Sequence, residues 1–488
     1  MEITDQERLQ REMEAETGLS VYPRSLAQQA GISYGLAHGP QGKELVILGA
    51  TEGFEGQRLG RALLGPTSAS NATRLRECLP WLRPQPLGIV TSVGCGDRLG
   101  LATPGHVRAV RTTPGIAPIF AQQSIRENAR TGRTPAEVID DAMWGVLQEG
   151  WRAPWGADAD HIKNKADLDS CIDCGYTFYT FDPGDWVDNA AHTAPLEVLR
   201  TSFAALPWWS LEDAPDGLLT RYLGREFHAG DFAWRFDEAD LLRAACKYGA
   251  ALAHAVGMVR HLARRLPAHR YEVELSVDET ETPTSPLEHL FIASELQRLE
   301  VHPVSLAPRY VGRFEKGVDY IGDVEAFAAE VAQHAAIARA FGPYKLSLHS
   351  GSDKFTVYPL VARYAGELAH LKTAGTSYLE AIRAIAHCAP ALFCTILDFA
   401  RGSYPADRAS YHVSAEVERV PEASPLQREA LPGLLDQFDA RQVLHVTFGS
   451  VLDAFGTQIK QVLADHEEAH YAALEAHFRR HLAPFAAD

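Results

Sequence analysis

Eight short apolar segments in the middle of the chain constrain its fold more than any other feature of the sequence. The segments are residues 88–93, 118–121, 155–159, 176–181, 271–277, 303–307, 344–348 and 367–371. Each has the length of a buried strand. Most of the connections between them are long enough to hold the helix that parallel strands require. The pattern predicts an α/β fold, a (β/α)8 TIM-type barrel.

Polar or charged residues follow almost every one of these segments. They are Asp97 and Arg98, Gln122 and Gln123, Asp160 and His161, Asp182, Asp278 and Glu279, Arg309, His349, and Lys372 and Thr373. In a (β/α)8 barrel the chemistry lies on the face where the strands end. We therefore expect these side chains to surround a candidate active site.

The chain is longer than one ordinary core requires, and its 488 residues suggest two to three domains. We expect an N-terminal α/β extension over 1–85 and a catalytic barrel over 86–400. The long connection 184–270 is predicted to be an inserted, largely helical subdomain. Residues 401–488 are predicted to form a mainly helical region packed on the barrel.

Local signals define some elements more closely. The extension is expected to begin with a charged helix, followed by a hairpin of 31–36 and 44–48 across a turn at 39–42. Residues 237–266 of the insertion have a helical pattern. The helical C-terminal region is expected to be interrupted at 411–413 and 443–447.

Composition argues against several classes of partner. The net charge is −17 and no basic stripe occurs, which disfavours a nucleic-acid partner. The apolar stretch 250–259 is broken by His254 and is too short to span a membrane. The N-terminus is highly charged and has no apolar signal core. Seven cysteines do not make a disulfide framework. A cytoplasmic location is expected.

Carboxylates on the fifth predicted strand indicate a functional site. Glu274, Ser276 and Asp278 alternate along it and therefore share one face. A carboxylate inside a barrel is costly to bury unless it binds a metal or is paired. A metal site is one interpretation, and a structural ion-pair network is the other.

The seventh strand carries a second set of polar residues. Lys345, Ser347 and His349 share a face, and the polar, glycine-containing loop 350–354 that follows is suited to binding an anionic group. The third strand adds Asp158 and Asp160 on one face, with His161 at its end.

Carboxylates beside histidines suit a divalent metal ion or an acid/base pair. The residue types do not distinguish among zinc, manganese, nickel and cobalt.

Two other motifs point to no function. Residues 94–100 follow a strand and resemble a dinucleotide-binding loop, but the last glycine is one position too far along, so a nicotinamide site is rejected. Cys171 and Cys174 form a lone CxxC and are interpreted as core thiols. Four further histidines lie in polar surroundings and were kept as candidates with no assigned role, namely His106, His370, His412 and His445.

Seven blocks closely resemble the tagaturonate epimerase family, and together they span most of the chain from about residue 88 to 460. The blocks are residues 120–128, 156–161, 276–286, 314–320, 347–355, 372–380 and 445–452. The resemblance implies a metal-dependent, carbohydrate-metabolising epimerase that interconverts D-tagaturonate and D-fructuronate. Some relatives also interconvert D-fructose and D-tagatose. By the same resemblance Glu274 and His349 are metal ligands, and His161 is our inference for a third.

The two sugar acids differ at a carbinol carbon whose C–H bond the ketone does not activate. Retro-aldol cleavage, rotation of the aldehyde and rejoining would invert that carbon, with a divalent metal stabilising the enediolate. Transient oxidation would need a hydride acceptor. On this hypothesis three residues are candidates for catalysis: Asp160 or Asp278 as the base and Lys345 to stabilise charge on oxygen. The substrate-binding residues are Gln123, Arg309 and Lys354, with Arg309 or Lys354 on the carboxylate.

Two alternatives remain open at this stage. A metal-dependent sugar-acid aldolase or lyase would use the same residues and differ only in releasing the fragments. A non-catalytic sugar-acid-binding protein would leave the buried carboxylates and histidines unexplained, and bound metal with turnover would exclude it. The sequence also leaves open whether the chain forms a homo-oligomer.

Overall fold

The structure is a computed structural model that describes residues 4–40, 42–423 and 426–486. Eight parallel strands close into a barrel, in the order β12-β13-β14-β15-β6-β7-β8-β9. Their bounds are β6 Ser92–Gly96, β7 Ala117–Ser124, β8 Gly156–Ile162, β9 Phe178–Phe181, β12 Glu272–Ser276, β13 Ser305–Ala307, β14 Lys345–Leu348 and β15 Ala369–Thr373. The predicted (β/α)8 architecture is confirmed.

Each barrel strand overlaps one of the predicted apolar segments, but several boundaries differ. β7 and β8 continue through the polar residues that were expected to follow them, so Gln122 and Asp160 lie within strands. Both strands also contain a break in register, between Ile119 and Ala121 where β7 pairs β8 and between Ala159 and Ile162 where β8 pairs β9. A bulge of this kind turns the following side chains toward a new direction.

Helices surround the barrel, as parallel connections require. They are α3 Thr103–Arg111, α4 Ile125–Thr131, α5 Pro135–Glu149, α6 Lys165–Cys174, α10 Pro286–Arg298, α11 Val324–Phe341, α12 Tyr358–Ala365 and α13 Thr376–Cys388. The start of α10 has a capping box, with Ser285 accepting from the Glu288 amide and Pro286 in the first turn. The main apolar core lies between these helices and the strands, where Trp155, Phe120 and Tyr179 are fully buried.

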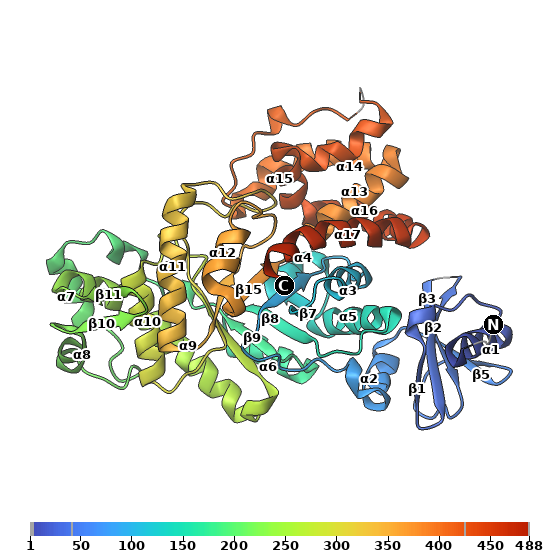
Figure 1. The fold of residues 1–488 in the computed structure, drawn as a ribbon. Coiled ribbons are helices and arrows are strands. Elements are labelled where there is room, and N and C mark those ends of the chain that lie inside the picture. The colour runs from blue at the N-terminus through green and yellow to red at the C-terminus, as the bar shows by residue number, and fades with distance from the viewer. Residues whose placement is uncertain (1–3, 41, 424–425, 487–488) are drawn as a thin grey trace.

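An antiparallel sheet precedes the barrel and lies to one side of it (blue in Figure 1). Its strand order is β1-β2-β3-β5-β4. The elements are α1 Asp5–Thr17, β1 Ala27–Gln29, β2 Ile32–Gly39, β3 Gly42–Leu48, β4 Gln57–Leu59, β5 Ala62–Pro66 and α2 Ala69–Cys78. β2 and β3 form the predicted hairpin. Gln41, in its turn, lies outside the described residues.

The connection between β9 and β12 carries the elements of the predicted insertion. They are α7 Leu196–Ala204, α8 Pro215–Tyr222, the hairpin strands β10 Glu226–Ala229 and β11 Phe232–Arg235, and the long helix α9 Glu238–Arg265. In Figure 1 the segment with α7, α8 and the hairpin (green) lies on the opposite side of the barrel from the N-terminal sheet.

The C-terminal helices are α14 Pro390–Asp407, α15 Phe438–Val446, α16 Phe448–Asp465 and α17 Glu467–Leu482, and α17 packs against α3 and α13. The expected interruption at 443–447 is wrong, because Val443–Val446 belongs to α15. That helix is buried on all sides from Asp439 to Val446, so its apolar residues show no helical period. None of the described helices combines the length and apolar content that a membrane span needs.

Candidate active site

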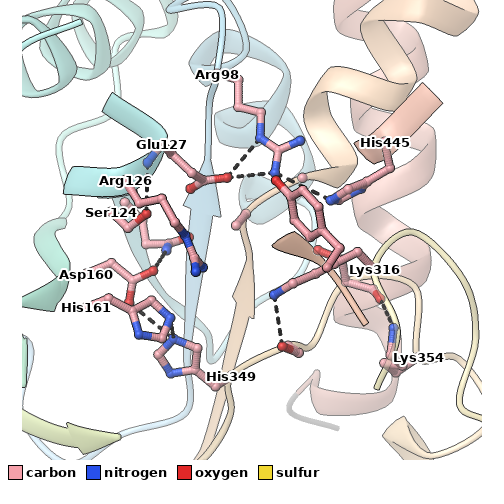
Figure 2. A pocket seen from close by; sticks show the side chains of 16 residues that line it. Arg98, Ser124, Arg126, Glu127, Asp160, His161, Lys316, His349, Lys354 and His445 are labelled. Carbon is pink, nitrogen blue, oxygen red and sulfur yellow. Dashed lines mark hydrogen bonds and ion pairs between the residues drawn. The ribbon is translucent and has the colours of Figure 1, made fainter. Parts of the chain in front are cut away.

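Three side chains converge where β8 and β14 end (Figure 2). His161 Nε2 lies 2.9 Å from His349 Nε2, and His349 Nε2 lies 3.2 Å from the Asp160 carboxylate. One ligand atom from each residue falls within 4.8 Å of the others. We call Asp160, His161 and His349 the triad below.

A carboxylate lies behind each imidazole of the triad. His161 Nδ1 is 3.0 Å from Asp182 Oδ2, and His349 Nδ1 is 3.3 Å from Glu274 Oε1. With a cation between the two rings, each carboxylate would hold the proton on the Nδ1 that faces it and leave Nε2 free to bind the ion. This is how carboxylates orient histidines that bind metal ions. The two Nε2 atoms face the same small space.

His161 has a strained backbone, and its surroundings favour a positive charge on the imidazole. Its φ of 50° lies in the left-handed region that side chains other than glycine rarely adopt. Such strain gathers where side chains are held for function. Burial opposes protonation, but Asp160 and Glu279 outweigh it and raise the pKa of His161 to about 8.

Lys372 lies beneath the triad and contacts three carboxylates in the barrel interior. Its Nζ is 2.8 Å from Asp158, 2.9 Å from Asp160 and 2.8 Å from Glu274. All four side chains are buried. The three carboxylates raise the pKa of Lys372 against the opposing effect of burial, so it stays charged.

The site fits a divalent cation. One lysine faces three buried carboxylates, and nearby carboxylates hold the pKa of His349 well above its usual range, so the cluster attracts positive charge to the imidazoles. Buried charge of this kind needs compensation. The triad supplies two imidazole nitrogens and a carboxylate oxygen, a donor set typical of borderline divalent ions that keep an open position. His161, His349 and Asp160 are therefore the residues that would hold the ion.

Two adjoining cavities open above the triad. The narrower one is lined by triad residues together with Gln122, Arg98, Lys316 and His445. The wider one has a volume of about 450 Å³ and is lined by Asp278, Arg309 and Tyr411 among others. Arg126, Lys316, His349, Ser350 and Tyr411 line both.

The predicted metal and base residues lie near one another. His161 and His349 face the same space, whereas Glu274 contacts the far nitrogen of His349 and also Lys372. Asp160 groups with the two histidines as a possible ligand, and the role of Glu274 as a ligand stays a prediction. Asp278 lies on the wall of the wider cavity, 3.9 Å from His349 Nδ1.

Lys345 and Gln123 were assigned to catalysis and substrate binding, but they lie elsewhere. Lys345 begins β14, and its Nζ donates to Gly88 O and Ser92 Oγ at the opposite end of the barrel. Gln123 donates to Thr131 and does not line either cavity. Its neighbour Gln122 donates to Asp160 at 2.9 Å and does line the narrower one.

The two residues expected at the substrate carboxylate differ in their surroundings. Arg309 is half-buried on the wider cavity. Lys354 lines the narrower cavity, but its Nζ donates to the main-chain carbonyls of Glu315, Val318 and Ser352. Burial lowers the pKa of Lys354 to about 7.

The sequence placed Gln122 and Lys372 among the residues expected around the site but gave them no role, and it did not single out Lys316. Lys316 lies in a loop without periodicity, and only the resemblance of residues 314–320 to the family marked it. Of the four unassigned histidines, His445 and His412 line the cavities, and His106 and His370 are buried away from them.

The two motifs rejected on sequence grounds serve the fold. In the glycine-containing loop, the amides of Leu99, Gly100 and Ala102 all donate to Asp97 and so are not directed at a ligand. Cys171 and Cys174 are free, and burial raises the pKa of both thiols.

Known proteins with similar sequences and structures point in one direction. The chain is 42% identical over 474 residues to the tagaturonate/fructuronate epimerase of Thermotoga maritima, covering 95% of this chain and 96% of that one. A glycerol-complexed crystal structure of fructuronate-tagaturonate epimerase UxaE from Cohnella laeviribosi superposes with a TM-score of 0.92, at 36% identity over 99% of each chain. The native crystal structure of the same epimerase superposes with a TM-score of 0.91, at 37% identity, over 97% of this chain and 98% of that chain.

Fold and site together define a (β/α)8-barrel enzyme with a candidate cation site where the strands end. The model of the tagaturonate epimerase family, UxaE, matches residues 22–485. The chain belongs to that family, and it is a carbohydrate epimerase of the isomerase class.

Proposed function

We propose that this enzyme interconverts D-tagaturonate and D-fructuronate and that it depends on a divalent cation held by the triad. The observation that carries the proposal is the pair of carboxylate-backed imidazoles whose Nε2 atoms lie 2.9 Å apart. The names and identity of the relatives support the substrate. Zinc, manganese, nickel and cobalt all suit the donor set.

When bound, the cation would supply positive charge for the ketone oxygen of the substrate. The protein supplies the remaining functions. Gln122 and Lys372 fix the Asp160 carboxylate through hydrogen bonds of 2.9 Å each, so its orientation is set before substrate arrives. Asp182 and Glu274 hold the two imidazoles in one tautomer. Lys345, which was expected to stabilise charge on oxygen, lines neither cavity and has no role in this proposal.

The inversion proceeds by retro-aldol and aldol steps. Asp278 removes the proton from the hydroxyl of the carbon that is inverted, since its carboxylate faces the wider cavity and the oxygens of Asp160 are already engaged. The bond to the α-carbon then breaks. The aldehyde fragment turns over and rejoins, and Asp278 returns the proton. A positioned base of this kind contributes about 10²–10⁴-fold to rate.

The first experiment is an NMR time course of metal-loaded and EDTA-treated enzyme with D-fructuronate. Metal-dependent formation of D-tagaturonate is expected. Substrate deuterated at the inverted carbon separates the two chemical routes, because retro-aldol chemistry retains the label without a primary isotope effect. Asp278→Asn should lower kcat by about 10²–10⁴-fold with bound metal retained. A primary isotope effect would favour transient oxidation and refute the mechanism.

Two related activities follow from the same residues. D-fructose and D-tagatose differ from the two uronates only at the terminal carbon, so they fit the same reaction at lower efficiency. An aldolase or lyase would release both fragments, and the NMR time course detects them. Because the seven cysteines are free thiols, the proposal includes a reducing, cytoplasmic setting.

A further inference from the structure

The cavity walls carry several cations, and the substrate proposed above has one carboxylate for them to bind. Each cation can be examined for a partner within the protein. Arg98 donates twice to Glu127, at 2.9 and 2.7 Å, and both are buried. Arg126 is 2.9 Å from Glu279, and Arg313 is 3.3 Å from Glu315. The charges of these three arginines are offset by carboxylates of the chain.

Lys316 differs from them. Its Nζ donates to Ser350 Oγ at 3.1 Å, and across the described part of the chain no carboxylate lies within ion-pair distance of it. Ser350 directly follows the triad residue His349. Lys316 lines the narrower cavity that contains the triad and the wider one as well. Figure 2 shows its ammonium group facing the cavity across from His349.

Two other cations fit a carboxylate less well. Lys354 uses its donors on main-chain carbonyls. Arg309 lines only the wider cavity, away from Asp160 and His161. In both uronates the carboxylate is two carbon–carbon bonds from the carbon that is inverted. The group that binds it must therefore lie near both the triad and Asp278, and Lys316 borders both cavities whereas Arg309 borders only the wider one.

We propose that Lys316 binds the carboxylate of the substrate and makes the enzyme selective for uronates over neutral ketohexoses. This inference rests on the proposed function. A charge-assisted hydrogen bond in a partly buried site is among the strong ones. Arg98 and His445 extend the same wall, since Arg98 Nη1 and His445 Nδ1 are buried donors that lack a partner among the described residues.

The carboxylate contact has a second consequence under retro-aldol chemistry. Cleavage breaks the bond between the α-carbon and the inverted carbon, and the electron pair stays on the ketone half. The proton of the β-hydroxyl goes to the base, and the other half becomes an aldehyde. That aldehyde, 2-hydroxy-3-oxopropanoate, carries the carboxylate. Lys316 therefore holds the fragment that must rotate, and so keeps the reaction an epimerisation.

The test compares Lys316→Gln with wild type, both metal-loaded, in three measurements. They are calorimetric binding and turnover of D-fructuronate, competitive inhibition by D-fructose, and NMR detection of dihydroxyacetone. D-fructose is the matched neutral probe because it replaces the carboxylate by a primary alcohol. We expect fructuronate binding to weaken about 10–100-fold, with an unchanged inhibition constant for D-fructose and with dihydroxyacetone released. Lys316→Arg should restore part of the selectivity.

Control variants separate Lys316 from its neighbours. Arg313→Gln removes an exposed cation from the same cavity rim and should bind fructuronate as wild type does. Arg309→Gln tests the rival position. The inference would be overturned if Arg309→Gln, and not Lys316→Gln, weakened the binding of D-fructuronate without affecting D-fructose. It would also be overturned if Lys316→Gln weakened the binding of both sugars equally. If Lys316→Gln weakened fructuronate binding selectively but released no dihydroxyacetone, Lys316 would bind the carboxylate without holding the aldehyde fragment.

The inference and the proposed function can fail separately. Wild type that binds fructuronate through Lys316 without converting it would refute the epimerase substrate and keep the carboxylate site. Equal conversion of fructuronate by wild type and Lys316→Gln would support the proposed function and refute the carboxylate site. Wild type that neither binds nor converts it would refute both.

Discussion

Replacing Lys372 by methionine should destabilise the metal-free enzyme, because it leaves Asp158, Asp160 and Glu274 without their shared cation. The lysine is buried, and its Nζ lies 2.8–2.9 Å from all three carboxylates. Removing one partner of a buried ion pair costs about 3–5 kcal/mol. An unfolding entropy of about 2.1 cal/mol/K per residue over 488 residues amounts to about 1 kcal/mol/K. The expected fall in Tm is therefore about 3–5 °C.

The assay is scanning calorimetry of EDTA-treated protein, with Lys345→Met as the matched control. Lys345 is equally buried in the same barrel, but its Nζ donates only to the neutral acceptors Gly88 O and Ser92 Oγ. Burial lowers the pKa of Lys345, so methionine also removes an unfavourable buried charge. We expect Lys345→Met to change Tm by about 1 °C or less. Equal shifts in the two variants would refute the charge argument.

Three further predictions concern the metal ligands, pH and packing. His349→Ala should lose bound metal, whereas Glu274→Gln should keep the metal with affinity lowered about 10–100-fold. Elemental analysis and chelator competition measure both. Equal loss of metal in the two variants would show that Glu274 is a ligand. Burial raises the pKa of Glu330 to about 7. Between the ordinary carboxyl pKa and pH 7 the folded state therefore binds more protons than the unfolded state. The free energy of unfolding falls as pH rises through that window. Glu330→Gln should match wild type at pH 5 and be more stable by about 1–2 kcal/mol at pH 8, discounted for partial exposure, and no gain in Tm at pH 8 would contradict this. A Cβ at Gly375 would overlap the His445 ring, so Gly375→Ala should cost about 1–3 kcal/mol and raise KM for fructuronate, and an unchanged Tm would show that the ring moves freely.

Predictions from the chain alone were reliable where the signal was local. A buried parallel strand is a short apolar run, and eight such runs with helical connections favour one closed architecture. Asp160, His161, Asp278 and His349, at the ends of those runs, line the two cavities, because strand ends meet on one face of a barrel.

Local patterns could not decide which side chain faces which neighbour. β7 shifts register between Ile119 and Ala121, so Gln122 and not Gln123 reaches the Asp160 carboxylate. Alternation along a strand predicts facing only while the register is regular. Lys345 shares a strand face with His349, yet it lies at the other end of the barrel. Alternation predicts which face a side chain is on and not how far along the barrel it lies.

The sequence by itself determined the barrel, the strand ends that carry the functional groups and the family to which the chain belongs. The tertiary structure alone decided how charge is distributed within the site. Lys372 became the shared partner of three carboxylates, Glu274 the carboxylate behind His349, and Lys316 a cavity cation with no carboxylate of the described residues within ion-pair distance. Each of these pairings joins strands or loops far apart in the chain, and Coulomb interactions depend on distance in space, which residue order does not contain.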